Sequence, residues 1–392
     1  MGKWECVRLG DVIRVTSGGT PKRDVKEYYE NGTIAWVKTG DLKSRYIFQT
    51  EEKITEHGVN CSSAKVFPTG TVLVAMYGAT IGACSILKVP ASTNQACAAL
   101  LPAINISENY LYYYFAYNKN LLISLGVGGA QPNISGNVIK NLVLPLPPLP
   151  IQQKIADVLD KASALIEMRK AQIEKLDLLI KSQFIEMFGD PVTNPKGWET
   201  IPLAKTGSFK NGINFSSNES GASLYCLGVG DFGNRMTINN TEQLSRVFLD
   251  KKPSAEHLLK DEDIVFVRSN GNKELVGRCV AVYPGRHETT FSGFCIRYRK
   301  TLDSILIEYL LQVLKSSSIR YKMIGRGANI QNLNQELLSQ LIIPVPPITL
   351  QQKFVTTTSK IVNMKRQFEE SLTASEFFNN SLMQKCFNGE IF

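Results

Sequence analysis

Pro145-Leu146-Pro147-Pro148, followed two residues later by Ile151-Gln152-Gln153-Lys154, lies near the middle of the chain and decides the fold, because it occurs twice. Its second copy is Pro344-Val345-Pro346-Pro347 with Leu350-Gln351-Gln352-Lys353, at an offset of 344 − 145 = 199 residues. The copies keep this register without a gap from Tyr110 and Tyr309 to Phe188 and Phe387. A repeat of this length predicts that one structural plan is built twice.

Upstream of this stretch the two copies correspond only loosely. Trp4-Glu5 pairs with Trp198-Glu199 at 198 − 4 = 194, and Gly40-Asp41 pairs with Gly230-Asp231 at 230 − 40 = 190, so the offset drifts. Most side chains there differ between the copies. We infer that the constant segments meet one kind of partner twice, and that the divergent segments meet two different ligands.

The repeat divides the 392 residues into two halves near residue 190, and each half is long enough to bury its own core. The expected order is globular, helical, globular, helical. Globular domains are predicted over residues 1–144 and 191–343, and helical spacers over residues 145–190 and 344–392.

The net charge of +9 is concentrated in the globular parts. Residues 1–144 hold 14 Lys and Arg against 10 Asp and Glu, and residues 196–343 hold 19 against 14, while the helical segments are near neutral. Positive charge favours a polyanionic partner, whose affinity comes largely from phosphate contacts and counterion release. Near-neutral helices are typical of a protein-facing surface. An ordinary solvated surface is the alternative for so modest an excess.

Two long helices are predicted to follow the proline pairs. Prolines forbid helix in the residues just before them, so the helices are expected to begin at about Ile151 and Leu350. Apolar residues then recur at steps of three and four, and helices that end at Phe188 and Phe387 would each be roughly 55 Å long. An antiparallel coiled coil of the two, with pseudo-two-fold symmetry, would cover both apolar stripes. Two independent helices, each packed on its own domain, are the alternative.

The globular segments are predicted to be mixed α/β (α+β) domains, mostly sheet with short helices. β-branched runs bounded by turns indicate strands, and the uncharged run Val66 to Leu87 is interpreted as two buried strands with a turn, because Pro68, Gly70, Gly78 and Gly82 interrupt it. Strands are expected at Val7–Val15, Ile34–Val37, Thr71–Met76, Leu224–Val229 and Ile264–Val267, and short helices at Tyr110–Tyr117 and Ile307–Leu314. The aromatic stretch from Tyr110 could stack nucleobases, but its counterpart from Tyr309 is aliphatic, which favours a core helix.

Several kinds of chemistry lack their motifs in this sequence. The eight cysteines form no Cys-x-x-Cys pair and the three histidines are scattered, so neither a metal site nor a disulfide framework is predicted. Nothing resembles a secretory signal, a P-loop, a His-Glu-x-x-His zinc motif or the Asn-Pro-Pro-aromatic tetrapeptide of amino-methyltransferases. We expect a soluble intracellular protein that binds and does not itself catalyse.

Polar and basic side chains on glycine-containing loops are the candidates for DNA contacts, because the backbone can approach a ligand closely there. Arg pairs with guanine, and Asn or Gln with adenine, through two hydrogen bonds in the major groove. A plain solvated turn is the alternative for any single loop, and the run from Arg268 to Lys273 is the strongest candidate. The candidates are Thr20, Lys22, Arg23, Lys43, Arg45, Tyr46, Tyr77, Asn94 and Gln95 in the first domain, and Lys210, Asn211, Asn214, Arg235, Arg268, Ser269, Asn270, Asn272 and Lys273 in the second.

Over its whole length the chain resembles the specificity subunits of type I restriction-modification systems. The resemblance rests on the two Pro-x-Pro-Pro and Gln-Gln-Lys helix entries, together with Ser17-Gly18-Gly19-Thr20-Pro21, Tyr77-Gly78-Ala79-Thr80-Ile81-Gly82, Thr93-Asn94-Gln95 and Phe188-Gly189-Asp190-Pro191. The second domain departs from the first, with Lys210-Asn211-Gly212-Ile213 in place of the Gly-Gly-Thr-Pro loop.

The resemblance implies that each globular domain is a target recognition domain that reads one half of a split double-stranded DNA sequence. It implies that the paired helices act as a spacer and dock two adenine-N6 methyltransferase subunits, which carry S-adenosylmethionine. Translocase-nuclease subunits, which use ATP and magnesium, join for restriction. No cofactor is expected in this chain, and its place is the bacterial or archaeal cytoplasm, at the nucleoid when bound to DNA. The helix entries are the candidate docking residues, namely Gln152, Gln153, Lys154, Gln351, Gln352 and Lys353.

Two other functions are open from the residues alone. One is a coiled-coil scaffold whose basic domains bind DNA without sequence preference, and a specific reader differs from it by keeping a preference among sequences at high salt. The other is a complete enzyme with its own active site, which would transfer methyl groups without partners.

Overall fold

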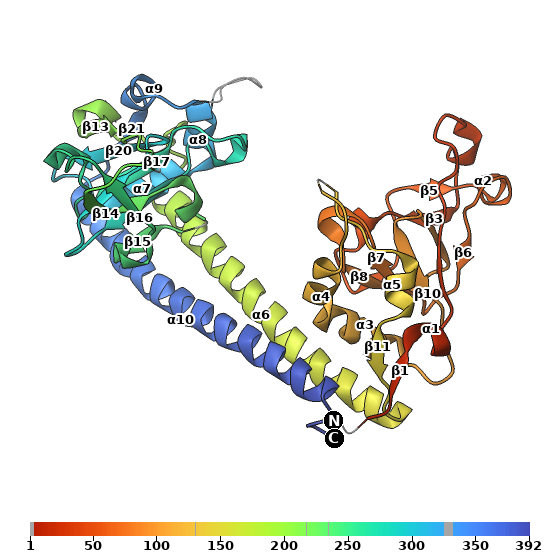
Figure 1. Cartoon of the computed structure of the whole chain (residues 1–392). Helices are drawn as coiled ribbons and strands as arrows, with labels where there is room; N and C mark the ends of the chain where they lie inside the picture. The colour runs from red at the N-terminus through yellow and green to blue at the C-terminus, as the bar shows by residue number, and fades with distance from the viewer. Residues whose placement is uncertain (1–3, 130, 217, 234, 325–331) are drawn as a thin grey trace. The chain divides into compact units, whose positions relative to one another are not determined.

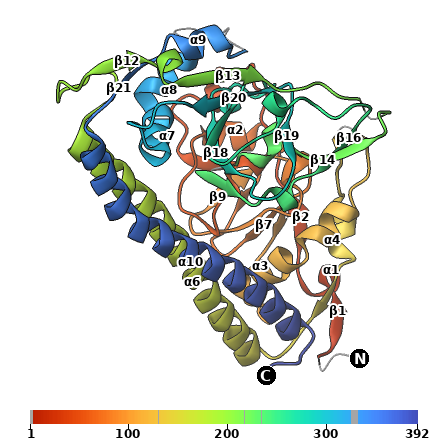
Figure 2. The same cartoon turned by 90° about the vertical axis from the view of Figure 1, so that its left-hand side faces the viewer.

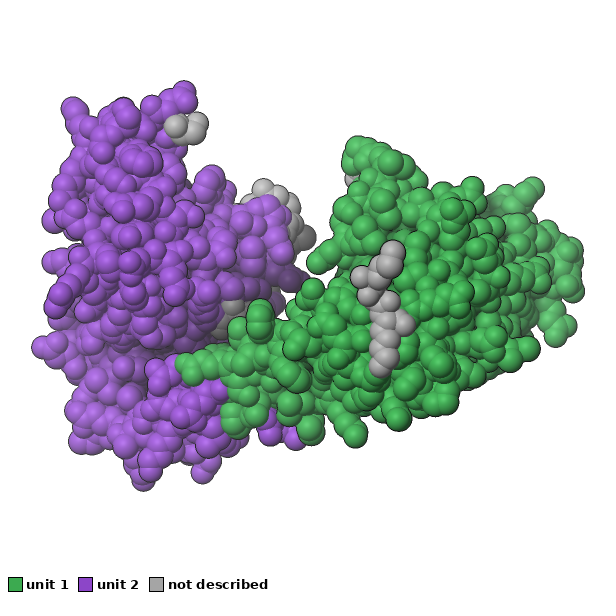
Figure 3. All heavy atoms as spheres, turned by 60° about the horizontal axis from the view of Figure 1, so that its bottom comes forward, with its two compact units in different colours: residues 1–171, 368–392 green, residues 172–367 purple. Residues whose placement is uncertain are grey.

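The computed structural model describes residues 4–129, 131–216, 218–233, 235–324 and 332–392, and the chain forms two compact units (Figure 3). Unit 1 combines residues 1–171 with residues 368–392, and unit 2 comprises residues 172–367. The divisions fall inside the two longest helices, α6 (Leu149–Phe188) and α10 (Ile348–Phe387). Each of these helices therefore contributes one half to each unit.

Unit 1 contains two sheets and a short two-stranded ladder. The five-stranded sheet has the order β2-β10-β7-β8-β4, the four-stranded sheet has the order β5-β3-β9-β6, and β1 pairs with β11. The strands are β1 (Cys6–Arg8), β2 (Val15–Ser17), β3 (Ile34–Val37), β4 (Tyr46–Ile47), β5 (Lys53–Ile54), β6 (Val66–Phe67), β7 (Val72–Ala75), β8 (Cys84–Leu87), β9 (Ala91–Thr93), β10 (Cys97–Leu100) and β11 (Val143–Pro145). The short helices are α1 (Leu9–Val12), α2 (Glu56–Asn60), α3 (Glu108–Tyr117), α4 (Lys119–Ser124) and α5 (Gly136–Lys140), with 3-10 turns η1 (Lys26–Tyr28), η2 (Thr39–Asp41) and η3 (Gly78–Thr80).

Unit 2 repeats this topology, except that its second sheet has no strand equivalent to β6. Its five-stranded sheet has the order β13-β20-β17-β18-β15, its three-stranded sheet has the order β16-β14-β19, and β12 pairs with β21. The strands are β12 (Thr200–Pro202), β13 (Gly207–Asn211), β14 (Ala222–Leu227), β15 (Thr237–Asn239), β16 (Arg246–Leu249), β17 (Asp263–Val267), β18 (Cys279–Tyr283), β19 (Thr289–Phe291), β20 (Cys295–Lys300) and β21 (Ile342–Pro344). The short helices are α7 (Ile307–Lys315), α8 (Ser317–Ile324) and α9 (Gln335–Ser339), with 3-10 turns η4 (Leu203–Lys205), η5 (Val229–Asp231), η6 (Thr241–Gln243), η7 (Ala255–His257) and η8 (Lys273–Leu275).

The registers show which residues of the two units are equivalent. Cys97 lies opposite Ala75 in unit 1, and Cys295 lies opposite Val267 in unit 2. The pairing of Gly40-Asp41 with Gly230-Asp231 is confirmed by a shared turn: Asp41 accepts the N–H of Lys38 at 2.8 Å, and Asp231 accepts the N–H of Gly228 at 2.8 Å. The duplicated plan therefore extends through the part of the sequence where the side chains diverge.

In each unit α6 and α10 lie side by side and antiparallel (Figures 1 and 2). Lys170 of α6 pairs with Glu376 of α10 at 3.6 Å in unit 1, and Asp177 of α6 pairs with Lys365 of α10 at 2.7 Å in unit 2. Phe184 packs on Phe354 with ring centroids 5.8 Å apart. The predicted antiparallel pair is confirmed, although each helix begins two residues before the predicted start. Pro150 is tolerated there because the first turn of a helix needs no N–H donor.

The core of unit 1 is built on α3, which confirms the interpretation of the aromatic stretch as a core helix. Tyr110 is fully buried and its ring lies 5.3 Å from that of Phe387 in α10, while its hydroxyl donates to the carbonyl of Pro145 at 2.7 Å. The equivalent Tyr309 is also fully buried and donates to the carbonyl of Pro344 at 3.0 Å. Both tyrosines thus tie the domain to the segment that leads into a long helix.

Two strand predictions were wrong in detail. The expected strand Val7–Val15 is interrupted by α1, because Leu9 and Ile13, four residues apart, both enter the core. The run from Val66 to Leu87 forms three strands, β6, β7 and β8, where two were expected. Among the described helices, none combines the length and the apolar character that a membrane crossing needs.

The start of each long helix is held by a buried glutamine. In unit 1 the amide of Gln152 accepts the N–H of Ser107 and donates to the carbonyls of Asn105 and Pro147, at 2.8–2.9 Å. In unit 2 the amide of Gln351 accepts the N–H of Leu306 and donates to the carbonyls of Ser304 and Pro346, at the same distances. Each glutamine therefore fixes the angle between its long helix and the domain that precedes it.

Candidate nucleic-acid interface

Three of the predicted loops of the first domain meet at one edge of unit 1. Thr20 Oγ1 donates to Gln95 Oε1 at 2.5 Å, and the N–H of Gly19 donates to the carbonyl of Thr93 at 2.9 Å. The register of β7 and β10 places Tyr77 opposite Gln95, just beyond the ends of both strands. We name Thr20, Tyr77, Asn94 and Gln95 the loop edge of unit 1.

The equivalent edge of unit 2 carries different side chains. The N–H of Ile213 donates to the carbonyl of Phe291 at 3.0 Å, as Gly19 does to Thr93, so Asn214 takes the place of Thr20. Gly293 takes the place of Gln95, and Asn214 lies against it, since a Cβ on Gly293 would collide with Oδ1 of Asn214. Ser269 takes the place of Tyr77, and both form an isolated bridge, with Asn332 and Asn133 respectively. We name Asn214, Ser269, Ser292 and Gly293 the loop edge of unit 2.

Both loop edges depend on a glycine at the same position. A Cβ on Gly18 would collide with the backbone of Thr93, and a Cβ on Gly212 would collide with the backbone of Ser292. In each unit the two backbone segments can therefore pass this close to each other only because the glycine has no side chain. This shared requirement positions Thr20 and Asn214 alike while leaving the side chains themselves free to differ.

A charged cluster lies beside the loop edge of unit 1. Arg23 stacks on the rings of Tyr29 and Trp36 at 4.8 and 4.7 Å and pairs with Glu52 at 2.6 Å, and Lys38 pairs with the same carboxylate. Hydrogen bonds from Lys38 and then from Arg23 hold the pKa of Glu52 below its ordinary value. Two cations share one carboxylate, so the cluster keeps a positive charge. Sequence reasoning missed Lys38, although it directly follows the predicted strand Ile34–Val37.

Arg45 and Tyr46 are not part of the loop edge, and their role as DNA contacts stays a prediction. Arg45 pairs with Asp160 of α6 and donates to Tyr113 Oη at 3.2 Å, and only 17% of its side chain is exposed. Burial opposes its charge, but the hydrogen bond to Asp160 raises the pKa of Arg45 above its ordinary value. The hydroxyl of Tyr46 donates to Asn109 at 3.3 Å. Arg45 thus joins the domain to α6, and Tyr46 contacts α3 within the domain.

Lys210 and Asn211 were predicted on a loop, but they lie in β13, opposite Arg297 and Ile296 of β20. Lys210 pairs there with Glu256. The loop proper begins at Gly212. Arg268 is half-buried just after β17, where its backbone bonds with Phe294 and Leu333 continue the edge of the sheet.

The other predicted contacts are on exposed or half-exposed loops. Asn270 accepts the N–H of Asn272 at 2.8 Å, and Asn272 accepts the N–H of Glu274 at 3.0 Å, so both side chains shape the turn after Ser269. Lys22, Lys43 and Arg235 are exposed. Asn234, beside Arg235, and the side chain of Lys273 lie outside the described part of the structure.

The predicted docking residues fall into two groups. Gln152 and Gln351 are fully buried and all their polar atoms are engaged within their units, so they offer no surface to a partner and this part of the prediction is corrected. The other four residues are exposed at the helix starts, namely Gln153, Lys154, Gln352 and Lys353. Hydrogen bonding inside the chain, which a pattern of letters does not reveal, separates the two groups.

Exposed apolar side chains on α6 and α10 were missed by the sequence interpretation. They occur in pairs related by the repeat offset: Leu165 with Met364, Leu178 with Phe377, and Leu179 with Phe378. Phe377 is 78% exposed and Phe378 is 61% exposed. In the antiparallel register of the two helices, Leu165 is level with Phe377 in unit 1, and Leu178 is level with Met364 in unit 2. Each unit thus has an equivalent set, which we name its apolar patch: Leu165, Phe377 and Phe378 in unit 1, and Leu178, Leu179 and Met364 in unit 2.

Comparison with known proteins identifies the chain's relatives. A family model described as the type I restriction modification DNA specificity domain matches residues 1–178. The MjaIX specificity subunit of Methanocaldococcus jannaschii is 27% identical, over 99% of this chain and 93% of that protein. The StySPI specificity subunit of Salmonella potsdam is 22% identical, over 99% of this chain and 89% of that protein. Both are specificity subunits of type I restriction enzymes.

Solved structures share the fold. A chain from structures of the assembly and conformational transition of a type I restriction-modification system aligns with a TM-score of 0.60 at 18% identity, covering 100% of this chain and 98% of that one. The S subunit from M. genitalium aligns with a TM-score of 0.53 at 16% identity, covering 98% of this chain and 96% of that one. With the family match over residues 1–178, the full-length relatives and the duplicated topology together, the chain is similar over its whole length to the specificity subunits of type I restriction-modification systems.

Proposed function

We propose that this chain selects the DNA target of a type I restriction-modification complex by reading a bipartite sequence, with one half-site for each globular domain. The observation that carries the proposal is a contrast within the repeat. The two loop edges carry different side chains, whereas the two long helices keep one register without a gap. Thr20, Tyr77 and Gln95 are replaced by Asn214, Ser269 and Gly293 on the same backbone frame. Side chains that differ on an equivalent frame suit two readers of different bases.

The basic excess of both globular segments supports DNA as the ligand, because phosphate contacts supply affinity while base contacts supply sequence preference. Exposed cations, such as Lys22 and Arg23 beside the loop edge of unit 1 and Arg235 elsewhere on unit 2, would take the phosphate role. The side chains of the loop edges would take the base role. We keep Lys43, Arg45, Tyr46, Arg268, Asn270 and Asn272 as candidates of either kind.

We further propose that the two apolar patches dock two copies of one partner, the adenine-N6 methyltransferase subunit. Equivalent exposed residues in both units suit two identical surfaces on two identical partners. The exposed residues of the helix starts, Gln153 and Lys154 with Gln352 and Lys353, would lie at the polar rim. S-adenosylmethionine would belong to that partner, and ATP and magnesium to a translocase-nuclease subunit, in the cytoplasm at the nucleoid.

Methylation of the host genome tests the proposed function. We expect that a host expressing this chain with its methyltransferase gains N6-methyladenine in one sequence motif with two specified parts and an unspecified gap of fixed length. Sequencing that detects methylated bases, in hosts with and without this gene, measures the result. A contiguous motif, or an unchanged methylome, would contradict the proposal and favour the scaffold alternative.

The patches are tested by charge substitutions in one unit at a time. We expect Phe377→Asp with Phe378→Asp to weaken docking of one methyltransferase copy by roughly 100-fold or more, because two large exposed apolar anchors are replaced by charges. Leu178→Asp with Leu179→Asp should do the same for the other copy. Native mass spectrometry of the purified complex should then show one copy in place of two.

Asn380→Asp is the control for the Phe377 and Phe378 variant, because it adds a negative charge at an exposed position of the same helix without removing an apolar side chain. It should leave two copies bound. Retention of two copies by both patch variants would show that the partner docks elsewhere.

A further inference from the structure

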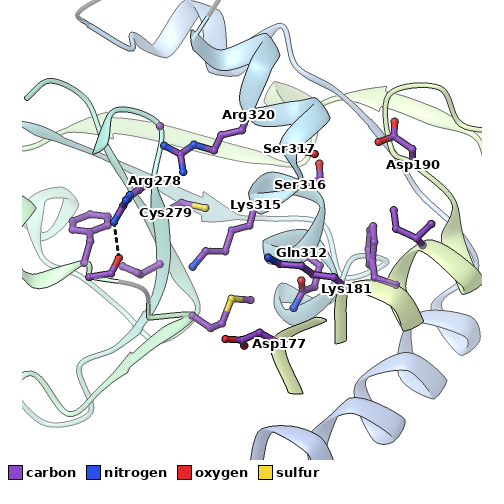
Figure 4. Close-up of a pocket in the computed structure, with 17 residues that line it drawn as sticks. Asp177, Lys181, Asp190, Arg278, Cys279, Gln312, Lys315, Ser316, Ser317 and Arg320 are labelled. Atoms are coloured by element: carbon purple, nitrogen blue, oxygen red, sulfur yellow. Dashed lines mark hydrogen bonds between the residues drawn. The ribbon is translucent and has the colours of Figure 1, made fainter. Parts of the chain in front are cut away.

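A cavity of about 630 Å³ opens in unit 2 between the second half of α6, the strand β18 and the helices α7 and α8 (Figure 4). Its volume lies within the range of roughly 300–1,000 Å³ that small-molecule sites occupy. Four cationic side chains and two carboxylates line it: Lys181, Arg278, Lys315 and Arg320, with Asp177 and Asp190. The lining therefore has a positive excess.

Three of these cations have no acidic partner in the described part of the chain. Lys315 extends from α7 into the cavity, where its Nζ donates to the carbonyl of Arg235 at 2.5 Å. Arg278 donates to the carbonyl of Gly233 at 3.2 Å, and Arg320 donates to the carbonyls of Glu274 and Val276. Carbonyl acceptors satisfy donors but neutralise no charge, so the positive excess stays in place.

The two carboxylates of the cavity are engaged elsewhere. Asp177 pairs with Lys365 of α10 at 2.7 Å. Asp190 accepts the N–H groups of Val192 and Thr193 at 2.9 and 3.1 Å, where the chain leaves α6. Neither is within ion-pair distance of Lys315, Arg278 or Arg320 among the described residues.

Burial, reinforced by neighbouring cations, lowers the pKa of both Lys315 and Arg320. Burial is the main cause that holds the pKa of Lys315 below its ordinary value, an effect that Cys279 opposes and that Lys365, Arg278 and Arg320 reinforce. Burial and then Arg278 lower the pKa of Arg320 in the same way, an effect that Cys279 and Glu274 oppose. Burial raises the pKa of the Cys279 thiol to about 11, so this group is neutral at pH 7 and offers no compensating charge.

The same place in unit 1 is built differently. There Arg45, Tyr113 and Asp160 form the joint between the domain and α6, whereas the equivalent positions of unit 2 carry smaller neutral groups. The three cations of the cavity likewise replace apolar residues. The equivalent pairs, unit 1 first, are Arg45 and Met236, Tyr113 and Gln312, Asp160 and Ser359, Ala83 and Arg278, Ala116 and Lys315, and Leu121 and Arg320. The duplicated plan does not require the cavity, so its charge belongs to unit 2 alone.

We propose that this cavity binds a phosphate-bearing anion through Lys315, Arg278 and Arg320. The planar guanidinium groups and the lysine ammonium retain donors for phosphate oxygens, and the anion would compensate the buried charge. Lys315 and Arg278 also hold the carbonyls of Arg235 and Gly233, in the segment that leads from η5 to β15. A bound anion would therefore stiffen a segment that carries Arg235.

The test is a titration of the full-length chain with inorganic phosphate, tripolyphosphate and a nucleoside triphosphate, at ionic strength matched with chloride. We expect the thermal unfolding midpoint to rise with tripolyphosphate, and calorimetry to give a dissociation constant. Lys315→Met and Arg320→Met should each raise that constant roughly tenfold or more. Lys315→Met should leave the midpoint in chloride alone unchanged or higher, because it removes an uncompensated buried charge.

Lys322→Met is the matched control, because it removes an exposed lysine from α8 that does not line the cavity. It should bind tripolyphosphate like the parent chain. Absence of any response in the parent, or an equal response in Lys315→Met and Lys322→Met, overturns the proposal. So does a Lys315-dependent response to an acidic peptide but not to phosphate, which would assign the cavity to a protein carboxylate.

Competition between duplex DNA and tripolyphosphate distinguishes two sources of the bound phosphate. If saturating duplex DNA displaces tripolyphosphate, and Lys315→Met weakens duplex binding equally for all sequences, the site takes a backbone phosphate. If tripolyphosphate binds undiminished beside the duplex, the site takes a free phosphate compound. Both outcomes support an anion site. The titration needs no partner subunit and no target sequence, so its failure would leave the proposed function untouched.

Discussion

Exchange of residues 191–344 for the matching segment of a relative is expected to change one half of the methylated motif completely and to leave the other half as it was. Unit 2 carries its own sheets and its own loop edge, and extending the exchange to Pro344 moves the β12 and β21 ladder as one piece. Methylome sequencing of hosts that express the parent or the chimera measures the effect. Loss of one half-site and gain of another would be an all-or-none change.

The design of the chimera follows from the contacts of Tyr309. Its ring packs on Phe184 and Phe188 of α6 at 5.8 and 4.8 Å, so the donor segment should retain an aromatic residue there. A chimera that exchanges residues 1–144 instead is the reciprocal control and should change the other half-site. If either exchange altered both halves, the two domains would not read independently.

Gln152→Ala is expected to lower the free energy of unfolding of unit 1 by about 2–4 kcal/mol, because it leaves one buried N–H and two carbonyls without partners. Gln351→Ala should do the same in unit 2. The three tryptophans report on the units separately, since Trp4 and Trp36 lie in unit 1 and Trp198 lies in unit 2. Variants that keep a single tryptophan, unfolded in urea and followed by fluorescence, measure each effect.

Gln153→Ala and Gln352→Ala are the matched controls, because both neighbours are exposed. They should change the free energy of unfolding by less than about 0.5 kcal/mol. A loss of the same size in the controls would mean that the side chains of the helix start, rather than the buried amides, account for the stability.

The repeat made much of the fold predictable. Three signals located α6 and α10 to within two residues, because they are local in sequence. They are the proline pairs before each helix, the apolar periodicity, and the absence of Gly and Pro from Ile151 to Phe188 and from Leu350 to Phe387. The identical offset in both copies predicted antiparallel pairing, and the ion pairs Lys170–Glu376 and Asp177–Lys365 confirm it. Short strands were less predictable. The expected strand Val7–Val15 is interrupted by α1, because Leu9 and Ile13 both enter the core.

The candidate site was predictable only where glycine marks close chain approach. Gly18 and Gly212 correctly marked both loop edges. Arg45 looked like a free cation that could contact DNA, because its ion-pair partner Asp160 lies 115 residues away in the sequence. Lys210 likewise pairs with Glu256, 46 residues away, and the glutamines 152 and 351 look like surface residues until their backbone partners are known. Long-range partners decide which polar residues are free, and a single sequence does not show them.

The packing of Phe387 on Tyr110, Tyr114 and Tyr117 has a consequence for the order in which the chain folds during synthesis. Unit 2 is contiguous in sequence and can close its core once residue 367 has left the ribosome. Residues 1–171 of unit 1 are made before unit 2 but wait for residues 368–392, which are made after unit 2 and complete the core of unit 1. Unit 1 therefore starts before unit 2 and finishes after it, and until then its tyrosines must stay shielded from other chains.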